Sequence, residues 1–170
     1  MARAYGVPAE AVRDGLLAYQ PEPHRNATVA TIGGVRYVDD SKATNPHAAA
    51  ASLAAYPSIV WIGGGQLKNV DVDDLVASVA DRLRGAVLLG IDRAEIAAAL
   101  ARHAPDVPVV DVSATDDGAM GEVVVAAAAL ARPGDTVLLA PAAASKDMYA
   151  SYGARGDAFA AAVRALGAAG

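Results

Sequence analysis

The feature that most constrains this chain is a regular alternation of short apolar segments with alanine-rich segments after residue 45. Short apolar runs bounded by glycine or proline predict buried strands, and the longer alanine-rich stretches predict helices. Strands are expected at 59–62, 86–89, 107–110 and 136–139, and helices at 46–55, 72–83, 93–103, 118–131 and 151–166. Such alternation produces right-handed crossovers, and therefore a parallel sheet covered by helices on both faces.

The segment before residue 45 has a different pattern. Two strand-like runs, 26–32 and 35–39, are joined by Gly33-Gly34, which favours a tight hairpin because glycine adopts positive φ. The predicted fold class is therefore α/β: a three-layer Rossmann-like sandwich with a mostly parallel six-stranded sheet and one antiparallel strand from the hairpin. A helix expected at 8–18 cannot continue through Pro21 and Pro23. We predict a division into residues 1–20, a helix and linker, and residues 21–170, the domain.

The composition excludes several classes of function. A formal net charge of −5 and a pI near 5.0 argue against a nucleic-acid partner, which would require a basic surface. The chain has no cysteine, which excludes disulfides, thiol nucleophiles and zinc–thiolate sites, and its three histidines are widely spaced. No apolar run has membrane-spanning length, and the first residues lack the apolar stretch of a signal peptide. We therefore expect no membrane partner and a cytoplasmic location.

Ligands of parallel α/β sheets bind beyond the carboxyl ends of the strands, so the loops at those ends are the candidate sites. The chain has 11 arginines and three lysines, and Lys42, Lys68 and Lys146 all fall in these loops. The first loop leads into Asn45 and Pro46, a typical N-cap and first residue of a helix. It is either an anion-binding helix N-terminus or a capped turn with solvated charges.

Two further loops carry polar groups. Three glycines, residues 63–65, allow a ligand close to the backbone, with Lys68 as countercharge, but the spacing fits neither a Walker A loop nor G-x-G-x-x-G. In the loop after residue 140, Ser145 can donate to a carboxylate, while Tyr149 and Tyr152 either line a pocket or pack on one helix face. Two alternatives remain: a stand-alone module that binds a nucleotide phosphate at 63–68, and a scaffold whose loops are only capped turns.

A group of aspartates follows the second loop. Asp71, Asp73 and Asp74 are close enough in sequence to suggest a metal site. Their spacing also fits the acidic first turn of a helix, because carboxylates stabilise a helix N-terminus. We favour the helix interpretation and assign no metal ligand.

Several motifs, in order along the chain, resemble those of a known family. They are Pro23-His24-Arg25, Asp40-Ser41-Lys42-Ala43-Thr44-Asn45, Gly63-Gly64 with Lys68, and a closing segment with Pro141, Ser145, Asp147, Tyr152, Arg155 and Gly156. Together they resemble the C-terminal domain of the Mur ligases that add D-glutamate, over essentially the whole chain. The loop at 40–45 is specific, because Mur ligases for other amino acids have different loops there. Ala140 and Tyr152 depart from the pattern, which more often has Ser and Phe.

The resemblance implies the third domain of a three-domain, ATP-dependent ligase of peptidoglycan synthesis. In this family ATP phosphorylates the carboxylate of UDP-N-acetylmuramoyl-L-alanine, which releases ADP, and the amine of D-glutamate then attacks the acyl phosphate to form an amide and release phosphate. ATP and Mg²⁺ would be bound mainly by the central domain. The partners would be D-glutamate, the UDP-linked substrate, and the N-terminal and central domains of the same polypeptide. Residues 1–20 would be a remnant of the central domain's last helix with its linker, and the chain alone is expected to be inactive.

The resemblance also implies roles for individual residues. Lys42 would face the transferring phosphoryl and acyl groups, with Asp40 and His24 as further catalytic residues. Asp40, His24 and Arg25 would lie at the contact with the central domain, where they would contact ATP or orient Lys42. The D-glutamate pocket would be formed by Thr44, Lys68, Ser145, Lys146 and Tyr152, with backbone N–H donors near Lys146.

Overall fold

The computed structural model of the chain describes residues 2–19, 22–114, 116 and 118–169. Its centre is a six-stranded sheet in the order β1-β2-β6-β3-β4-β5. The strands are β1 (Ala27–Ile32), β2 (Val35–Asp39), β3 (Ile59–Gly64), β4 (Leu83–Leu89), β5 (Val109–Asp111) and β6 (Thr136–Leu139). β1 pairs antiparallel with β2, and the other neighbouring strands pair in parallel. The predicted α/β fold class is confirmed.

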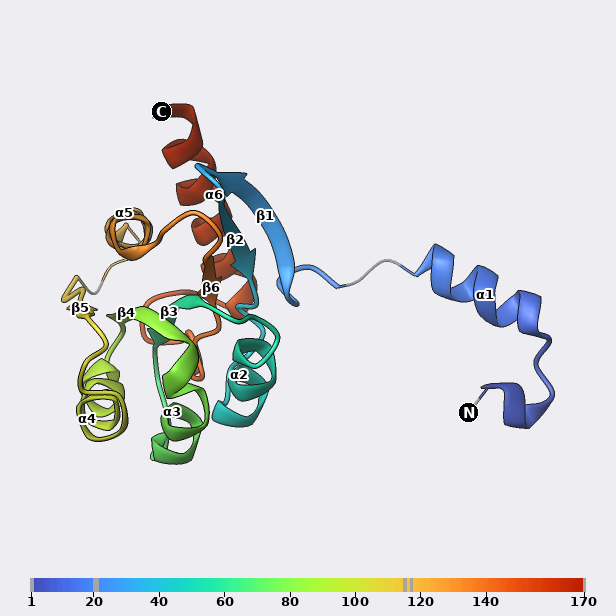
Figure 1. Cartoon of the computed structure of the whole chain (residues 1–170), viewed down its shortest axis with the longest axis horizontal. Helices are drawn as coiled ribbons and strands as arrows, with labels where there is room; N and C mark the ends of the chain where they lie inside the picture. Colours follow the sequence, from blue (N-terminus) through green and yellow to red (C-terminus); the bar gives the residue numbers. More distant parts are fainter. Residues whose placement is uncertain (1, 20–21, 115, 117, 170) are drawn as a thin grey trace.

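Helices cover both faces of the sheet (Figure 1). One face carries α2 (Pro46–Leu53), α3 (Asp73–Val79) and α4 (Arg93–His103), and the other carries α5 (Ala119–Leu130) and α6 (Tyr152–Ala169). In β3, Ile59 and Trp61 pack into the core under α2–α4, whereas Val60 and Ile62 pack into the core under α5 and α6. Successive strand residues point to opposite faces, so a strand buried on both faces has a continuous apolar sequence.

Several element boundaries differ from the prediction, and two of the differences have a clear physical reason. The helix expected at 72–83 ends at Val79, a 3-10 turn η2 (Ala80–Arg82) follows, and β4 already begins at Leu83. Leu83 pairs with Ile59, so strand pairing overrides the helical pattern there. β5 begins two residues later than expected, because Pro108 has no N–H to donate; its carbonyl accepts a hydrogen bond from Ala86 N–H at 2.9 Å.

The N-terminal helices η1 (Ala2–Tyr5) and α1 (Ala9–Ala18) stand apart from the sandwich (Figure 1). No residue of α1 is buried, and Leu16 and Leu17 are largely exposed. The predicted division of the chain falls on Gln20 and Pro21, which lie outside the described residues, so the division remains a prediction. In the described part of the chain, no helix has the length and apolar character needed to cross a membrane.

Candidate functional site

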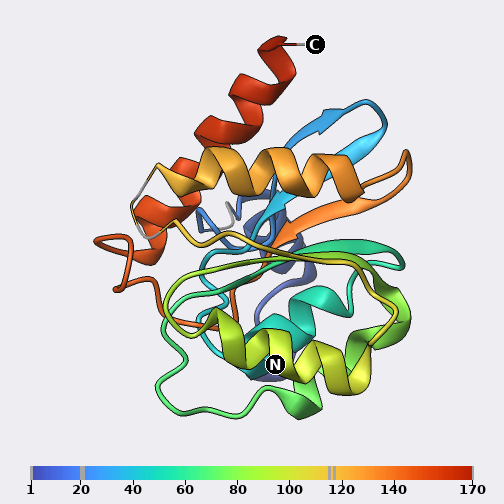
Figure 2. The same cartoon turned by 90° about the vertical axis from the view of Figure 1, so that its left-hand side faces the viewer.

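Three loops converge at one edge of the sheet. They follow β2, β6 and β3, which are parallel neighbours, so their carboxyl ends lie together. Ala142 N–H donates to the Ala43 carbonyl at 3.0 Å, and Gln66 and Ala144 exchange two backbone hydrogen bonds of 2.8 and 3.0 Å. Figure 2 shows the segment after β3 (green) and the segment after β6 (orange-red) at the same end of the sheet. We call this edge the rim; its loops carry Thr44, Lys68 and Ser145.

Arg155, on α6, connects the three loops. Its guanidinium donates to the Ser41 hydroxyl and carbonyl at 2.9 and 3.0 Å, to the Ala143 carbonyl at 3.2 Å, and to the Gly64 carbonyl at 3.4 Å. These acceptors follow or end β2, β6 and β3, respectively. Arg155 is 1% exposed. Burial lowers the pKa of Arg155 to about 10, so the guanidinium stays charged at neutral pH.

The three lysines of the rim have different surroundings. Lys42 Nζ forms an ion pair with Glu22 and lies 5.7 Å from the centre of the Tyr152 ring. Lys146 is exposed, and its Nζ donates to a carbonyl of its own loop at 2.6 Å. Lys68 is exposed and has a backbone φ of 58°, in the left-handed region that non-glycine residues rarely adopt.

The other predicted glutamate-binding residues differ in accessibility. Thr44 is half-buried, and Tyr152 is 40% exposed. The Tyr152 carbonyl accepts a hydrogen bond from the Ser41 hydroxyl at 2.8 Å, which places the start of α6 against the loop after β2. Ser145 is only 4% exposed. Ser145 is therefore the least accessible member of this set.

His24 and Asp39 form a pair beside the loop after β2. His24 Nδ1 lies 2.7 Å from one Asp39 carboxylate oxygen, and the other oxygen accepts from Ser41 N–H at 2.9 Å. Gly156 packs against this pair: a Cβ at Gly156 would lie 2.2 Å from His24 Nδ1 and 2.7 Å from Asp39 Oδ2. Only glycine leaves room here, which explains the Arg155-Gly156 sequence.

Asp40 and Lys42 form hydrogen bonds with the segment that precedes β1. An Asp40 carboxylate oxygen accepts from Asn26 N–H at 3.0 Å, and Lys42 N–H donates to the His24 carbonyl at 3.1 Å. A cavity of about 320 Å³ lies next to these bonds. It is lined by Arg25, Asn26, Asp40, Lys42, Ala43, Ala48, Ala51 and Ser52. The structure thus places two cations and one carboxylate around this cavity, against the alanine face of α2; His24 is not among its lining residues.

Sequence comparison identifies the family. Residues 24–143 match the family described as "Mur ligase, glutamate ligase domain". The chain belongs to the Mur ligase family. This Mur ligase domain is 69% identical over 166 residues to UDP-N-acetylmuramoylalanine--D-glutamate ligase of Thermobifida fusca, covering 98% of this chain and 36% of the relative. It is 67% identical over 168 residues to the ligase of the same name from Streptomyces coelicolor, covering 99% of this chain and 36% of the relative.

The chain spans about a third of the length of these curated relatives. Among solved structures, MurF from Acinetobacter baumannii aligns with a TM-score of 0.56 and 20% sequence identity, covering 81% of this chain and 31% of that one. At this identity the structural match supports the fold alone. It is consistent with the sheet order and the two helical layers described above.

Arg155 is a residue of the rim whose connecting position the sequence analysis did not predict. It was part of the family motif, but no role was assigned to it. Arginine is rarely buried, and the sequence places Arg155 only near the start of a helix, so nothing in the pattern indicates its burial. The one available signal was its fixed place in the closing motif, between Tyr152 and Gly156.

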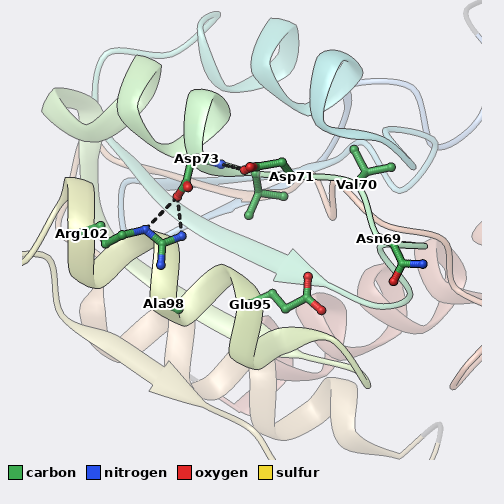
Figure 3. Close-up of a pocket in the computed structure, with 8 residues that line it drawn as sticks. Asn69, Val70, Asp71, Asp73, Glu95, Ala98 and Arg102 are labelled. Carbon is green, nitrogen blue, oxygen red and sulfur yellow. Dashed lines mark hydrogen bonds and ion pairs between the residues drawn. The ribbon is translucent and has the colours of Figure 1, made fainter.

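The helix interpretation of the aspartates after the second loop is confirmed for Asp73 and Asp74, whereas Asp71 precedes the helix. Asp73 and Asp74 lie in the first turn of α3, and Asp71 accepts from Asp73 N–H at 2.7 Å. Asp73 also pairs with Arg102 at 2.5 Å, and this hydrogen bond lowers the pKa of Asp73 (Figure 3). A cavity of about 450 Å³ lies here between the 69–73 segment and α4. None of the predicted site residues lines it, and the residues that the structure describes contain no metal-binding group of three or more His, Cys, Asp or Glu.

The pairing of Lys42 gives a pH-dependent prediction. Hydrogen bonds from Lys42 and then Arg25 lower the pKa of Glu22, so the ion pair persists above the ordinary glutamate pKa and is lost as the pH falls through the lowered value. NMR titration should therefore show a depressed Glu22 pKa, and Lys42→Ala should raise it more than Arg25→Ala does. Arg13→Ala is the control, because Arg13 pairs with Asp14 instead. A Glu22 pKa that does not respond to Lys42→Ala would contradict the pairing.

Proposed function

We propose that this chain is the C-terminal, D-glutamate-binding domain of an ATP-dependent ligase that adds D-glutamate to UDP-N-acetylmuramoyl-L-alanine in the bacterial cytoplasm. The supporting observation is the rim, where the loops carrying Thr44, Lys68 and Ser145 are hydrogen-bonded to one another. Two ligases of that name share about two thirds of the residues of this chain. The other domains of such a ligase would contribute the UDP-linked substrate and most of the ATP site.

The rim suits an amino acid with two carboxylates. Exposed Lys68 offers a cation, and Thr44 and Ser145 offer hydroxyl donors from the neighbouring loops. Charge-assisted hydrogen bonds of this kind fix the orientation of a carboxylate. With both carboxylates of D-glutamate held, its amine is left free to be aimed at the activated substrate, and Tyr152 would cover one side. The contribution of the domain is therefore mainly to position the nucleophile.

The cavity beside Asp40 would contact part of the nucleotide. Arg25 and Lys42 are suited to phosphate oxygens, and Asp40 can accept from a hydroxyl. Bound ATP would supply the phosphoryl group that activates the substrate carboxylate. Lys42 would then stabilise negative charge at the reacting groups, which requires it to leave Glu22. We assign His24 a supporting role here, because its ring is held by Asp39 and its carbonyl by Lys42 N–H.

The alternative of a stand-alone phosphate-binding module has less support. A glycine-rich loop cradles phosphate with free backbone N–H groups. In this loop, Gly64 N–H donates to the Pro141 carbonyl at 2.8 Å, Gln66 N–H to Ala144, and Leu67 N–H to Asp92 at 2.7 Å. These donors hold the loop in place and are not directed toward a ligand. The glycines therefore serve close packing at the rim rather than phosphate binding.

Substitution of Lys68 tests the proposal. In the full-length ligase that contains this domain, Lys68→Ala should raise the KM for D-glutamate by roughly 10- to 100-fold, the effect of losing one charge-assisted hydrogen bond, and change the KM for ATP little. Steady-state kinetics with each substrate varied in turn measures both. Arg132→Ala, at an exposed arginine, is the matched control and should change neither.

Two results would refute the proposal. Equal increases in both KM values for Lys68→Ala would indicate a defect in folding or domain closure rather than a lost carboxylate contact. ATP-dependent ligation by the 170-residue chain alone would contradict the assignment of the remaining chemistry to other domains.

A further inference from the structure

The loop after β4, residues 90–92, contacts the loop that carries Lys68. An Asp92 carboxylate oxygen accepts from Leu67 N–H at 2.7 Å, and Asp92 N–H donates to the Gly65 carbonyl at 3.1 Å. The two backbones are in close contact, since a Cβ at Gly90 would lie 2.5 Å from Gly65 N and Cα. Asp92 thus contacts both sides of the turn that leads into Lys68.

Lys68 adopts a backbone conformation that needs such support. Its φ is 58° and that of Asn69 is 61°, both in the left-handed region, which is strained for a lysine. Strained residues of this kind persist only where neighbouring contacts hold them. The residue before Lys68 is held by its buried side chain, since Leu67 is 3% exposed, and by the Asp92 hydrogen bond to its N–H.

The same loop also contacts the segment that carries Ser145. An Asp147 carboxylate oxygen accepts from Ile91 N–H at 2.9 Å. Residues 90–92 are therefore hydrogen-bonded to the Lys68 loop through Asp92 and to the Ser145 loop through Ile91. This loop does not contain any of the residues assigned to substrate, but it sets the relative position of two loops that do.

We propose that Asp92 is a positioning residue for Lys68: its carboxylate fixes the Leu67 N–H and so directs the Lys68 side chain toward a carboxylate of D-glutamate. The identity of the substrate in this inference rests on the proposed function, whereas the hydrogen bond between Asp92 and Leu67 is independent of it. Asp92 acts on the position of a cation that contacts the amino acid in both the ground state and the transition state. Its loss therefore raises the KM for D-glutamate and leaves kcat nearly unchanged.

Two readouts test the role of Asp92. In the 170-residue chain, hydrogen exchange of the Leu67 amide should accelerate in Asp92→Ala and stay slow in Asp92→Asn, because the Asn side-chain oxygen accepts the same hydrogen bond. In the full-length ligase, Asp92→Ala should raise the KM for D-glutamate about tenfold, and Asp92→Asn less than about twofold, with the KM for ATP unchanged in both. Asp106→Ala, at an exposed aspartate, is the control.

Three results would overturn the positioning role of Asp92. They are a Leu67 amide as protected in Asp92→Ala as in the wild type, a KM for D-glutamate that Asp92→Ala does not change, and an Asp92→Asn variant as impaired as Asp92→Ala. If Asp92→Ala does not fold, Asp92→Ser, whose hydroxyl is too short to reach Leu67, gives the same comparison. A wild-type ligase that does not use D-glutamate refutes the proposed function instead, while the amide exchange still decides the geometry.

Discussion

Replacement of Arg155 by alanine is expected to lower the free energy of unfolding of this chain by about 3–5 kcal/mol, because it removes a buried side chain and leaves buried acceptors without hydrogen-bond donors. The carbonyls of Ser41, Ala143 and Gly64 would lose their guanidinium donors in a region with little access to water. The three loops of the rim would also lose their common connection, so D-glutamate binding should fail along with stability. Urea denaturation followed by circular dichroism measures the first effect.

Matched variants separate this effect from a general loss of charge. Arg155→Lys keeps the charge but has fewer donors, so its stability should fall between those of the wild type and Arg155→Ala. Arg164→Ala removes an exposed arginine from the same helix and should change the free energy of unfolding by less than about 0.5 kcal/mol. An Arg155→Ala variant as stable as Arg164→Ala would contradict the connecting role of Arg155.

Gly64→Ala is expected to destabilise the chain by about 3 kcal/mol or more, or to prevent folding. Gly64 has a φ of 123°, and a Cβ there would lie 1.9 Å from the Leu89 carbonyl oxygen. The neighbouring atom belongs to the backbone of β4, so relief requires β3 and β4 to separate at the rim rather than a side chain to rotate. Thermal or urea denaturation reports the loss directly.

A second glycine supplies a control of opposite sign. Gly121 lies in α5, and a Cβ there would meet no atom within 4 Å. Gly121→Ala should therefore raise the free energy of unfolding by up to about 1 kcal/mol through higher helix propensity. If Gly64→Ala and Gly121→Ala had similar effects, the close approach between β3 and β4 would not be the cause.

Most of the fold was predictable because its signals are local. The apolar runs of β3, β4 and β6 and the Gly33-Gly34 hairpin identify an α/β sheet with one antiparallel strand. The predicted end of α3 was wrong. Pairing of Leu83 with Ile59 decides where β4 begins, and no nearby residue in the sequence indicates this pairing. Tertiary pairing overrides local propensity at such boundaries.

The loops of the candidate site were predictable for a different reason. Parallel strands place their carboxyl ends at one edge, so the positions of Lys42, Lys68 and Ser145 after three such strands imply a shared edge. Their individual roles remain predictions. The pairing of Lys42 with Glu22, and the burial of Ser145, are findings of the structure that the loop sequences did not indicate.

The sequence by itself determined the α/β class, the hairpin and the position of the loops at one edge of the sheet, because hydrophobic periodicity and turn residues act over a few positions. Only the tertiary structure decided how those loops are held. Arg155 reaches acceptors in three separate segments, and Asp92 reaches back to Leu67. Such contacts join residues from 12 to 114 positions apart, where chain periodicity carries no information. They form because buried donors and acceptors must find partners once the layers have packed.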